Sequence, residues 1–394
     1  MPDIDTVRIG LLGCGAMGSL HARYLLAGDV PNARLVAIQD ANPQRRTALH
    51  EEHGDRVRLF DSTEALLTSG AVDAVMIATP HYTHPELAIA AFDRGLHVLV
   101  EKPAGVYTRQ VRQMNEAAAR SGKTFAIMYM QRLRPIYGQL RALVSQGQIG
   151  ALKRVQWTAT GWYRSQSYYD ANPWRATWAG EGGGVLLNQC THQLDLWQWI
   201  FGLPSRVRAF CHFGRYHEIE VEDDVTAYLE YEAGHTAVFI ASTGETPGTD
   251  RLEVVGDRGK IVLDNKSLTF WETGVSERQF NRTYTGGFGE PEYARREICQ
   301  DRSGDPAHAD ITRNWVQAIR NGIPLVAPGV EGIRSLELSN AMLLSTWEDD
   351  WVRLPVDEDR FYALLQERIA RSTVRKKCSH RTLDVAQSYK TRQA

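Results

Sequence analysis

Short apolar runs alternate with helical patterns over the first 130 residues of the chain. The apolar runs have the length of buried strands and cover residues 7–12, 35–39, 72–78 and 97–100. Helical patterns separate them at residues 16–26, in a polar segment around 45–49, and at 86–93. Strands that alternate with helices in this way predict a doubly wound parallel sheet. We expect residues 1–133 to form one α/β domain around that sheet.

The pattern changes after residue 137, where strand-like runs follow one another with few helices between them. These runs cover residues 154–160, 206–212, 225–231, 236–242, 251–255 and 260–263. Turns at Gly234, Gly256 and Gly259 join several of them, which favours an open, mostly antiparallel sheet. Helical patterns return at 308–321 and 332–347, and a polar, basic tail begins near residue 371. We therefore expect a second α/β domain over residues 134–394.

Composition and charge are those of an ordinary globular protein and narrow the classes of partner. The 45 basic and 47 acidic residues leave a net charge of −2, which gives no long-range attraction to nucleic acid or anionic membrane. No apolar run approaches the ~20 residues that span a bilayer, and the acidic N-terminus lacks a signal-peptide layout. Five scattered cysteines without a C-x-x-C pair predict free thiols. We expect a cytoplasmic protein that binds neither nucleic acid nor membrane.

A glycine-rich turn follows the first predicted strand and opens the first predicted helix. Its sequence, Gly13-Cys14-Gly15-Ala16-Met17-Gly18, has the spacing G-x-G-x-x-G. In a βαβ unit such glycines allow a tight turn, close approach of a pyrophosphate and tight packing of helix on strand. Free N–H groups at the helix N-terminus attract phosphate. The turn predicts a dinucleotide site formed by Gly13, Gly15, Ala16, Met17 and Gly18.

An acidic residue at the end of the second predicted strand bears on which dinucleotide binds. Asp40 is placed to accept hydrogen bonds from the adenosine ribose hydroxyls and to repel a 2′-phosphate. Arg45 and Arg46 follow closely, and an arginine can accommodate that phosphate. The position of the acid favours NAD, with NADP as the alternative, and we include Arg45 among the expected cofactor contacts.

Two polar segments follow predicted strands directly and so lie at the carboxyl edge of the sheet, where open α/β folds bind ligands. One is Thr79-Pro80-His81 and the other is Glu101-Lys102-Pro103. Lys102 at this edge can face the nicotinamide, hydrogen-bond the reacting oxygen and help to move its proton. The alternative is an ordinary surface lysine.

A later helical pattern aligns three polar residues on one face. It covers residues 185–201, behind three glycines, and places Asn188, His192 and Asp195 at i, i+4 and i+7. A neutral His192 with a near-neutral pKa can accept a hydroxyl proton, and Asp195 can orient it or pair with another group. The alternative is a core histidine satisfied by its neighbour. A metal site is disfavoured because a third clear ligand is lacking.

The segment 161–178 is rich in aromatic and arginine side chains. It contains Trp162, Tyr163, Arg164, Tyr168, Tyr169, Trp174, Arg175 and Trp178. Aromatic faces stack on the C–H surfaces of sugars, and guanidinium groups bind carboxylate, sulfonate or phosphate. We interpret Arg164, Tyr168, Trp174 and Arg175 as part of a carbohydrate pocket, with an anionic sugar as one option. A subunit interface is the alternative, since these residue types also mark interfaces.

Together these segments resemble the glucose–fructose oxidoreductase/inositol dehydrogenase/MocA family from residue 7 to about residue 355. The likeness rests on GCGAMGS (13–19), ATPHYTH (78–84), HVLVEKP (97–103) and GGGVLLNQCTHQLD (182–195). The dinucleotide motif is generic, whereas EKP combined with the GGG…H-x-x-D run is specific. The resemblance implies an N-terminal Rossmann domain and a C-terminal α/β domain whose open, mostly antiparallel sheet commonly forms oligomer contacts. A homodimer or homotetramer is therefore expected.

The resemblance also implies roles for individual residues. Lys102 matches the catalytic or substrate-orienting lysine, followed by a proline that is often cis, and His192 matches the usual acid/base. Many polyol dehydrogenases of the family carry Asp where this chain has Asn188. The amide of Asn188 cannot exchange a proton with the catalytic base, so a proton relay assisted by a carboxylate is in doubt for this chain. Asn188 can still hydrogen-bond a sugar hydroxyl, and Asp195 is grouped with it as a substrate contact. The cofactor contacts implied by the motifs are Thr79, Pro80, His81, His84, Glu101 and Lys102.

Three functions fit these motifs. The first is a dehydrogenase that transfers a hydride between NAD(P) and a secondary alcohol of a sugar, sugar derivative or cyclitol. The second is an NAD-dependent glycoside hydrolase that oxidises a sugar carbon, eliminates the aglycone, adds water and returns the hydride, including on an anionic glycoside. The third is a non-catalytic dinucleotide-binding module.

Overall fold

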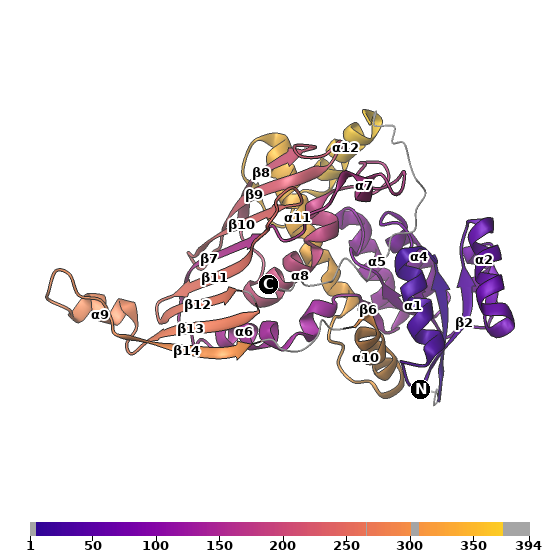
Figure 1. Cartoon of the computed structure of the whole chain (residues 1–394), viewed down its shortest axis with the longest axis horizontal. Helices are drawn as coiled ribbons and strands as arrows, with labels where there is room; N and C mark the ends of the chain where they lie inside the picture. The colour runs from indigo at the N-terminus through magenta and orange to yellow at the C-terminus, as the bar shows by residue number, and fades with distance from the viewer. Residues whose placement is uncertain (1–4, 265, 301–306, 373–394) are drawn as a thin grey trace.

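Two β-sheets with helices packed against them lie next to each other in the molecule (Figure 1). The computed structural model describes residues 5–264, 266–300 and 307–372. The predicted α/β fold class, with a parallel sheet first and a mostly antiparallel sheet second, is confirmed. The basic tail expected beyond residue 372 lies outside the described residues, as does Cys378.

The first sheet has six parallel strands in the order β3-β2-β1-β4-β5-β6. They are β1 (Val7–Leu12), β2 (Ala33–Gln39), β3 (Arg58–Phe60), β4 (Ala74–Ile77), β5 (His97–Val100) and β6 (Phe125–Ile127). The helices between them are α1 (Ala16–Ala27), α2 (Pro43–His53), α3 (Thr63–Leu67), α4 (Thr83–Asp93) and α5 (Thr108–Ser121), with a short helix η1 (Gly54–Arg56) after α2. The strand order reverses between β1 and β4, so ligands are expected beyond the carboxyl ends of these strands.

The second sheet has nine strands in the order β14-β13-β12-β11-β7-β10-β9-β8-β15. They are β7 (Leu152–Ala159), β8 (Arg206–Phe213), β9 (Glu222–Glu230), β10 (Thr236–Ser242), β11 (Asp250–Gly256), β12 (Gly259–Asp264), β13 (Ser267–Thr273), β14 (Tyr293–Gln300) and β15 (Val352–Arg353). The pair β7–β10 is parallel, and the other pairs are antiparallel. Alternate residues of β9 are buried and exposed, which is typical of an antiparallel sheet with one solvated face.

The helices of the second half of the chain differ in what they pack against. They are η2 (Met130–Leu133), α6 (Pro135–Ser145), α7 (Gln166–Tyr169), η3 (Val185–Gln189), α8 (Thr191–Phe201), α9 (Glu277–Thr283), α10 (His308–Asn321), η4 (Gly329–Glu331), α11 (Gly332–Glu348) and α12 (Glu358–Ala370). Helix α11 packs on β8, α8 and α5. Helix α9 lies on an arm that extends away from the body beyond β13 and β14 (Figure 1).

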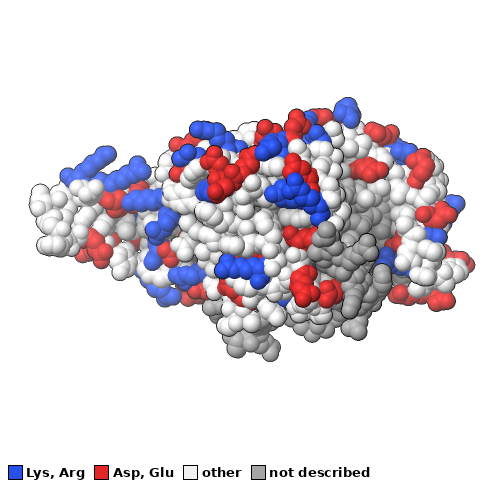
Figure 2. All heavy atoms as spheres, turned by 90° about the horizontal axis from the view of Figure 1, so that it is seen from above, with Lys and Arg blue, Asp and Glu red and all other residues white. Residues whose placement is uncertain are grey.

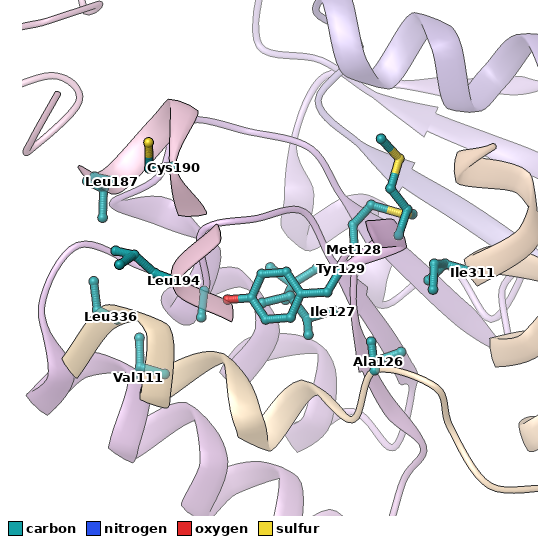
Figure 3. Close-up of a cluster of buried hydrophobic side chains, with 14 of the residues drawn as sticks. Val111, Ala126, Ile127, Met128, Tyr129, Leu187, Cys190, Leu194, Ile311 and Leu336 are labelled. Atoms are coloured by element: carbon teal, nitrogen blue, oxygen red, sulfur yellow. The ribbon is translucent and has the colours of Figure 1, made fainter. Parts of the chain in front are cut away.

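The hydrophobic core is continuous across the junction of the two sheets. Figure 3 shows Tyr129, just behind β6, among side chains that come from both halves of the chain, including Leu194 of α8 and Leu336 of α11. Tyr129 is fully buried, and its hydroxyl lies 2.6 Å from Ser335 Oγ in α11. The shared core holds the carboxyl edge of the first sheet against η3 and α8.

One predicted element differs from the structure at a place that matters for the site. The sequence pattern predicts a single helix over residues 185–201, but residues Val185–Gln189 form a π-helical turn and the α-helix begins at Thr191. The N–H of Cys190 donates to Val185 O (2.7 Å), one residue further back than in an α-helix. The extra residue changes the register, so Asn188 does not share one straight α-helical face with His192 and Asp195.

The surface seen in Figure 2 carries Lys and Arg side chains interspersed with Asp and Glu. No helix of the described residues is long and apolar enough to cross a membrane. Cys14, Cys190, Cys211 and Cys299 are free thiols, as predicted.

Candidate active site

The glycine turn after β1 has three glycines with different surroundings. Gly13 has φ of +82°, and a Cβ there would lie 2.9 Å from Ala78 O. A Cβ on Gly18 would lie 2.1 Å from Gly13 O, so helix α1 could not pack this closely on the turn with a larger residue. A Cβ on Gly15 would meet no atom within 4 Å. The open side of the turn is therefore at Gly15, at the N-terminus of α1.

This turn fits the pyrophosphate of a dinucleotide. Helix α1 begins at Ala16 with no side chain capping its N-terminus, so the first N–H groups of the helix, including that of Met17, are available to phosphate oxygens. Asp40 lies beside the turn, and its Oδ2 accepts the N–H of Cys14 (2.9 Å). The glycine turn, predicted to bind the pyrophosphate, and Asp40, predicted to bind the adenosine ribose, therefore lie next to each other.

Gly15 and Gly18 give a matched pair of substitutions. Gly15→Val is expected to weaken NAD binding with little change in Tm, because the backbone at Gly15 has φ of −73° and the side chain would fill only the open side of the turn. Gly18→Ala is expected to lower stability by about 1–3 kcal/mol through overpacking. Thermal unfolding with and without NAD separates the two effects. Equal loss of Tm in both variants would contradict this assignment.

The carboxylate of Asp40 is already engaged in the structure. Its Oδ2 also accepts from the Arg45 guanidinium (3.0 Å), and its Oδ1 accepts the N–H of Asn42 (2.9 Å). Arg46 donates to Asp40 O (2.7 Å). The Arg45 guanidinium is thus paired with Asp40. The positive charge near the expected position of the adenosine ribose is therefore neutralised by a carboxylate.

Removal of the Asp40 charge is expected to move cofactor preference toward NADP. In Asp40→Asn, Arg45 loses its ionic partner and becomes available to a 2′-phosphate, whose charge-assisted hydrogen bonds contribute about 1.5–3 kcal/mol. The ratio of NADH to NADPH dissociation constants, from fluorescence titration, should rise roughly tenfold or more. Adding Arg45→Ala should cancel the gain, and a gain that persists would contradict the role of Arg45.

Lys102 follows β5 and reaches across to the second half of the chain. Its Nζ donates to Asn188 O (3.0 Å) and to Asn188 Oδ1 (3.3 Å) in the π-helical turn. The peptide bond between Lys102 and Pro103 is cis. Since Asn188 is followed within one turn by His192, this contact brings the two residues predicted to be catalytic to the same place.

Burial changes the proton affinities of both groups. Burial lowers the pKa of Lys102 from its usual 10.5, while the charges of Glu101 and Glu181 oppose that effect. Burial, with the nearby Lys102 charge, lowers the pKa of His192 to about 3. His192 is therefore a neutral ring at ordinary pH, and its pKa is not near neutrality as we expected from the sequence. Among the described residues, no group hydrogen-bonds its Nδ1.

Two residues predicted to contact the cofactor have their polar atoms occupied by the protein itself. One Glu101 oxygen lies 2.8 Å from His21 Nε2, and the other accepts the N–H of Lys102 (3.1 Å). His84 is 1% exposed, and its two ring nitrogens lie 2.8 Å from Pro103 O and 2.8 Å from Thr79 O. Glu101 and His84 thus hold the loops that follow β4 and β5, and their contacts with the cofactor stay a prediction.

The loop after β4 contacts the second half of the chain through His81. His81 Nδ1 lies 3.2 Å from Glu181 O, and its ring packs against Trp174 with centroids 5.7 Å apart. Burial, with neighbouring positive charges, holds the pKa of His81 well below its usual range. Thr79 Oγ1 accepts from Thr83 Oγ1 (2.8 Å), and Pro80 is exposed at the tip of the loop. These residues remain predicted cofactor contacts.

The aromatic and arginine-rich segment brings four of its residues together. Arg175 lies over the Tyr168 ring (4.3 Å) and the Trp174 ring (4.9 Å), and Arg164 lies over Tyr168 (5.1 Å). Arg175 also donates to the Tyr168 hydroxyl (2.5 Å), which receives a long hydrogen bond from Asn188 Nδ2 (3.5 Å). These four residues therefore gather next to Asn188, as a substrate pocket would require.

Asp195 does not join this group. It is fully buried, and its two oxygens accept from Arg132 Nε (2.9 Å) and Arg132 Nη2 (2.6 Å). Arg132 also donates to Glu331 (2.6 Å), so the ion pair links η2, α8 and η4. The expectation that Asp195 binds substrate does not fit this geometry, because its carboxylate is buried and both of its oxygens are bound to Arg132.

Sequence reasoning missed three buried acids and bases that support the site. Glu181 bonds Asn188, and His21 bonds Glu101. Glu222 accepts the N–H groups of Gly184 (2.8 Å) and Leu186 (3.0 Å) and so anchors the start of η3, and burial raises its pKa to about 7. Glu181 lies directly before the three glycines, and this position in the motif could have marked it as a residue of the site. No group of three or more His, Cys, Asp or Glu within the described ranges is arranged to hold a metal ion.

Two family models match the chain. One, described as an oxidoreductase family with an NAD-binding Rossmann fold, matches residues 7–129. The other, described as a GFO/IDH/MocA C-terminal domain, matches residues 137–262. The gap between the two matched ranges covers η2 and the start of α6.

Individual relatives agree with these matches. An inositol 2-dehydrogenase from Rhizobium meliloti is 26% identical over 354 residues, which cover 87% of this chain and 98% of the relative. A scyllo-inositol 2-dehydrogenase (NAD(+)) from Bacillus subtilis is 28% identical over 267 residues, covering 65% of this chain and 73% of the relative. The crystal structure of the WlbA dehydrogenase from Bordetella pertussis with NADH and UDP-GlcNAcA superposes with a TM-score of 0.73 at 27% identity, covering 89% of this chain and all of the other.

Proposed function

This chain belongs to the GFO/IDH/MocA family of NAD-dependent oxidoreductases, and we propose that it oxidises a secondary hydroxyl of a sugar, sugar derivative or cyclitol. The observation that carries the proposal is the contact of Lys102 Nζ with Asn188, 3.0 Å from its carbonyl oxygen and 3.3 Å from its amide oxygen. It brings a lysine from the carboxyl edge of the NAD-binding sheet to the turn that precedes His192. The relatives named for cyclitol oxidation support the substrate class.

The glycine turn, the N-terminus of α1 and Asp40 are the residues that would hold the adenosine diphosphate portion of NAD. When bound, NAD supplies the ring carbon that takes the hydride. Lys102 and His192 then lie where the substrate hydroxyl must lose its proton. The pKa of His192, about 3, makes its ring a weak base, whereas burial only lowers the pKa of Lys102 from a usual value of 10.5, so we assign the proton to Lys102 rather than to His192.

The remaining residues of the site orient the substrate. Tyr168 and Trp174 bring aromatic rings next to Asn188, and the guanidinium groups of Arg164 and Arg175 that lie over these rings bring hydrogen-bond donors for the oxygens of a substrate ring. A neutral His192 can donate or accept one hydrogen bond at the reacting oxygen. Together these groups favour a polyhydroxylated ring over a simple aliphatic alcohol.

The experiment is a screen of purified enzyme with NAD against polyols, cyclitols, sugar acids and glycosides, followed by NADH absorbance. Sustained NADH formation with at least one secondary alcohol is expected. If neither NADH nor any other product forms with these classes, the proposed substrate class is wrong.

A glycoside hydrolase that uses NAD only transiently is the second candidate. It needs a further proton-handling group for the elimination step, and the Tyr168 hydroxyl beside Arg175 (2.5 Å) is one. Cleavage of a glycoside at catalytic NAD without net NADH would favour this function over the first. We also propose that the chain acts as a homodimer or homotetramer, which light scattering would test.

A further inference from the structure

The amine of Lys102 lies against a neutral side chain in a part-buried position. Its two hydrogen-bond acceptors are the backbone and side-chain oxygens of Asn188. Burial disfavours its positive charge, and the guanidinium groups of Arg175 and Arg164 disfavour it further. A neighbouring group is therefore needed to keep the Asn188 side-chain oxygen directed at the amine.

The amide of Asn188 has two different ends, and its surroundings select one of them. Asn188 Nδ2 donates to Glu181 Oε1 in a short hydrogen bond. An ionised carboxylate can only accept, so it binds the NH₂ end of the amide and not the oxygen end. The oxygen, Oδ1, is then directed at Lys102 Nζ, 3.3 Å away.

Glu181 is itself held rigidly. It is 2% exposed, and its Oε2 accepts the N–H of Ala176 (2.5 Å). Its backbone oxygen contacts His81, and Arg175 lies 3.6 Å from Oε1. The next residue, Gly182, has φ of +82°, and a Cβ there would lie 2.3 Å from Val106. The chain therefore turns sharply at Gly182, and the carboxylate stays behind Asn188.

We propose that Glu181 is a positioning residue for Lys102. Its carboxylate fixes the Asn188 amide so that Oδ1 faces the lysine, and from behind that neutral amide it adds to the negative charge that Glu101 already places near the amine. This inference rests on the proposed function only in that it concerns the same lysine. Nothing in it requires a particular sugar.

The test measures the pKa of Lys102 directly, without any substrate. Brief competitive labelling with acetic anhydride over a range of pH, read by peptide mass spectrometry, gives the protonation curve of each lysine. The variants are Glu181→Gln, Asn188→Ala and the double variant. Glu337→Gln is the matched control, because Glu337 is also a buried glutamate that accepts a backbone N–H, from Val356, but lies in α11. Circular dichroism and NAD-induced stabilisation confirm that each variant folds.

Glu181→Gln is expected to lower the pKa of Lys102 by about one unit, since a nearby opposite charge is removed. Asn188→Ala should lower it in the same direction, and the double variant should fall by less than the sum of the two single effects, because the orientation of the amide is lost only once while the charge of Glu181 acts through space. Glu337→Gln should leave the Lys102 curve unchanged.

An unchanged Lys102 pKa in Glu181→Gln overturns the proposal. So does an unchanged pKa in Asn188→Ala, which covers the case that Glu181→Gln does not fold, and so does full additivity in the double variant. A shifted Lys102 pKa in an enzyme that oxidises no alcohol would leave the positioning role intact and reject the proposed function. Where a substrate is found, Glu181→Gln should lower kcat more than it changes KM.

Discussion

Replacement of Lys102 by Met is expected to lower kcat for alcohol oxidation by about two to four orders of magnitude, the usual contribution of a general base. NAD affinity should fall far less than kcat, because only the expected contact of Lys102 with the cofactor is lost and the glycine turn is unchanged. Methionine keeps the length of the side chain and removes its charge and hydrogen-bonding. Steady-state kinetics and NAD titration measure the two effects separately.

The pH dependence identifies which group takes the proton. Oxidation requires the unprotonated amine, so kcat should rise with pH through the pKa of Lys102, which burial lowers from 10.5, and should level off above it. His192 is already neutral above about pH 3 and should contribute no limb near pH 6.5. His192→Asn should therefore be slower but keep the rising limb, whereas Lys102→Met should lose it. If kcat of Lys102→Met still rises with pH, a group other than Lys102 accepts the proton.

Replacement of Arg132 by Met is expected to reduce the free energy of unfolding by about 3–5 kcal/mol, as for other broken buried ion pairs. Arg132 and Asp195 have side chains that are each 1% exposed, and the substitution leaves the Asp195 carboxylate buried without its cation. The same residue links η2 to α8 and η4, so the effect should be global. Denaturant unfolding measures the loss.

Two controls separate the lost charge pair from other effects of this substitution. Arg132→Met combined with Asp195→Leu should recover much of the stability, because the uncompensated charge is removed as well. Arg251→Met breaks an exposed pair with Asp264 and should cost only about 0–1 kcal/mol. If Arg132→Met costs no more than Arg251→Met, the buried pair does not hold the junction.

The Rossmann half of the fold could be predicted well because its signals are local. The strand at 7–12, the glycine turn and the strand at 97–100 all carry their own pattern, and each is found as an element or turn in the structure. Strands β13 and β14 were missed, since Tyr293–Gln300 has three adjacent charged residues at its centre and becomes a strand only by pairing with β13. Long-range pairing of this kind leaves little trace in the residues themselves.

The site was predicted in part for a similar reason. Lys102 and His192 were predicted to be catalytic from their motifs, and that role stays a prediction, whereas their closeness comes from the fold. The partners of Asp195 and Glu101 are Arg132 and His21, which are distant in sequence and stand in no motif. The π-helical turn at Val185–Gln189 was equally hidden, because an added residue in one turn does not alter an apolar pattern over so short a distance.

The position of α10 has a consequence for how the protein is made. This helix comes late in the chain, at His308–Asn321, yet it packs on α1, β1 and β5 of the first sheet. The Tyr24 hydroxyl of α1 lies 2.7 Å from Thr312 Oγ1 in α10. During synthesis, the side of the N-terminal sheet that α10 covers therefore stays exposed until the ribosome has released residues beyond 321. A fragment that ends near residue 133 would keep that apolar flank exposed permanently and should aggregate.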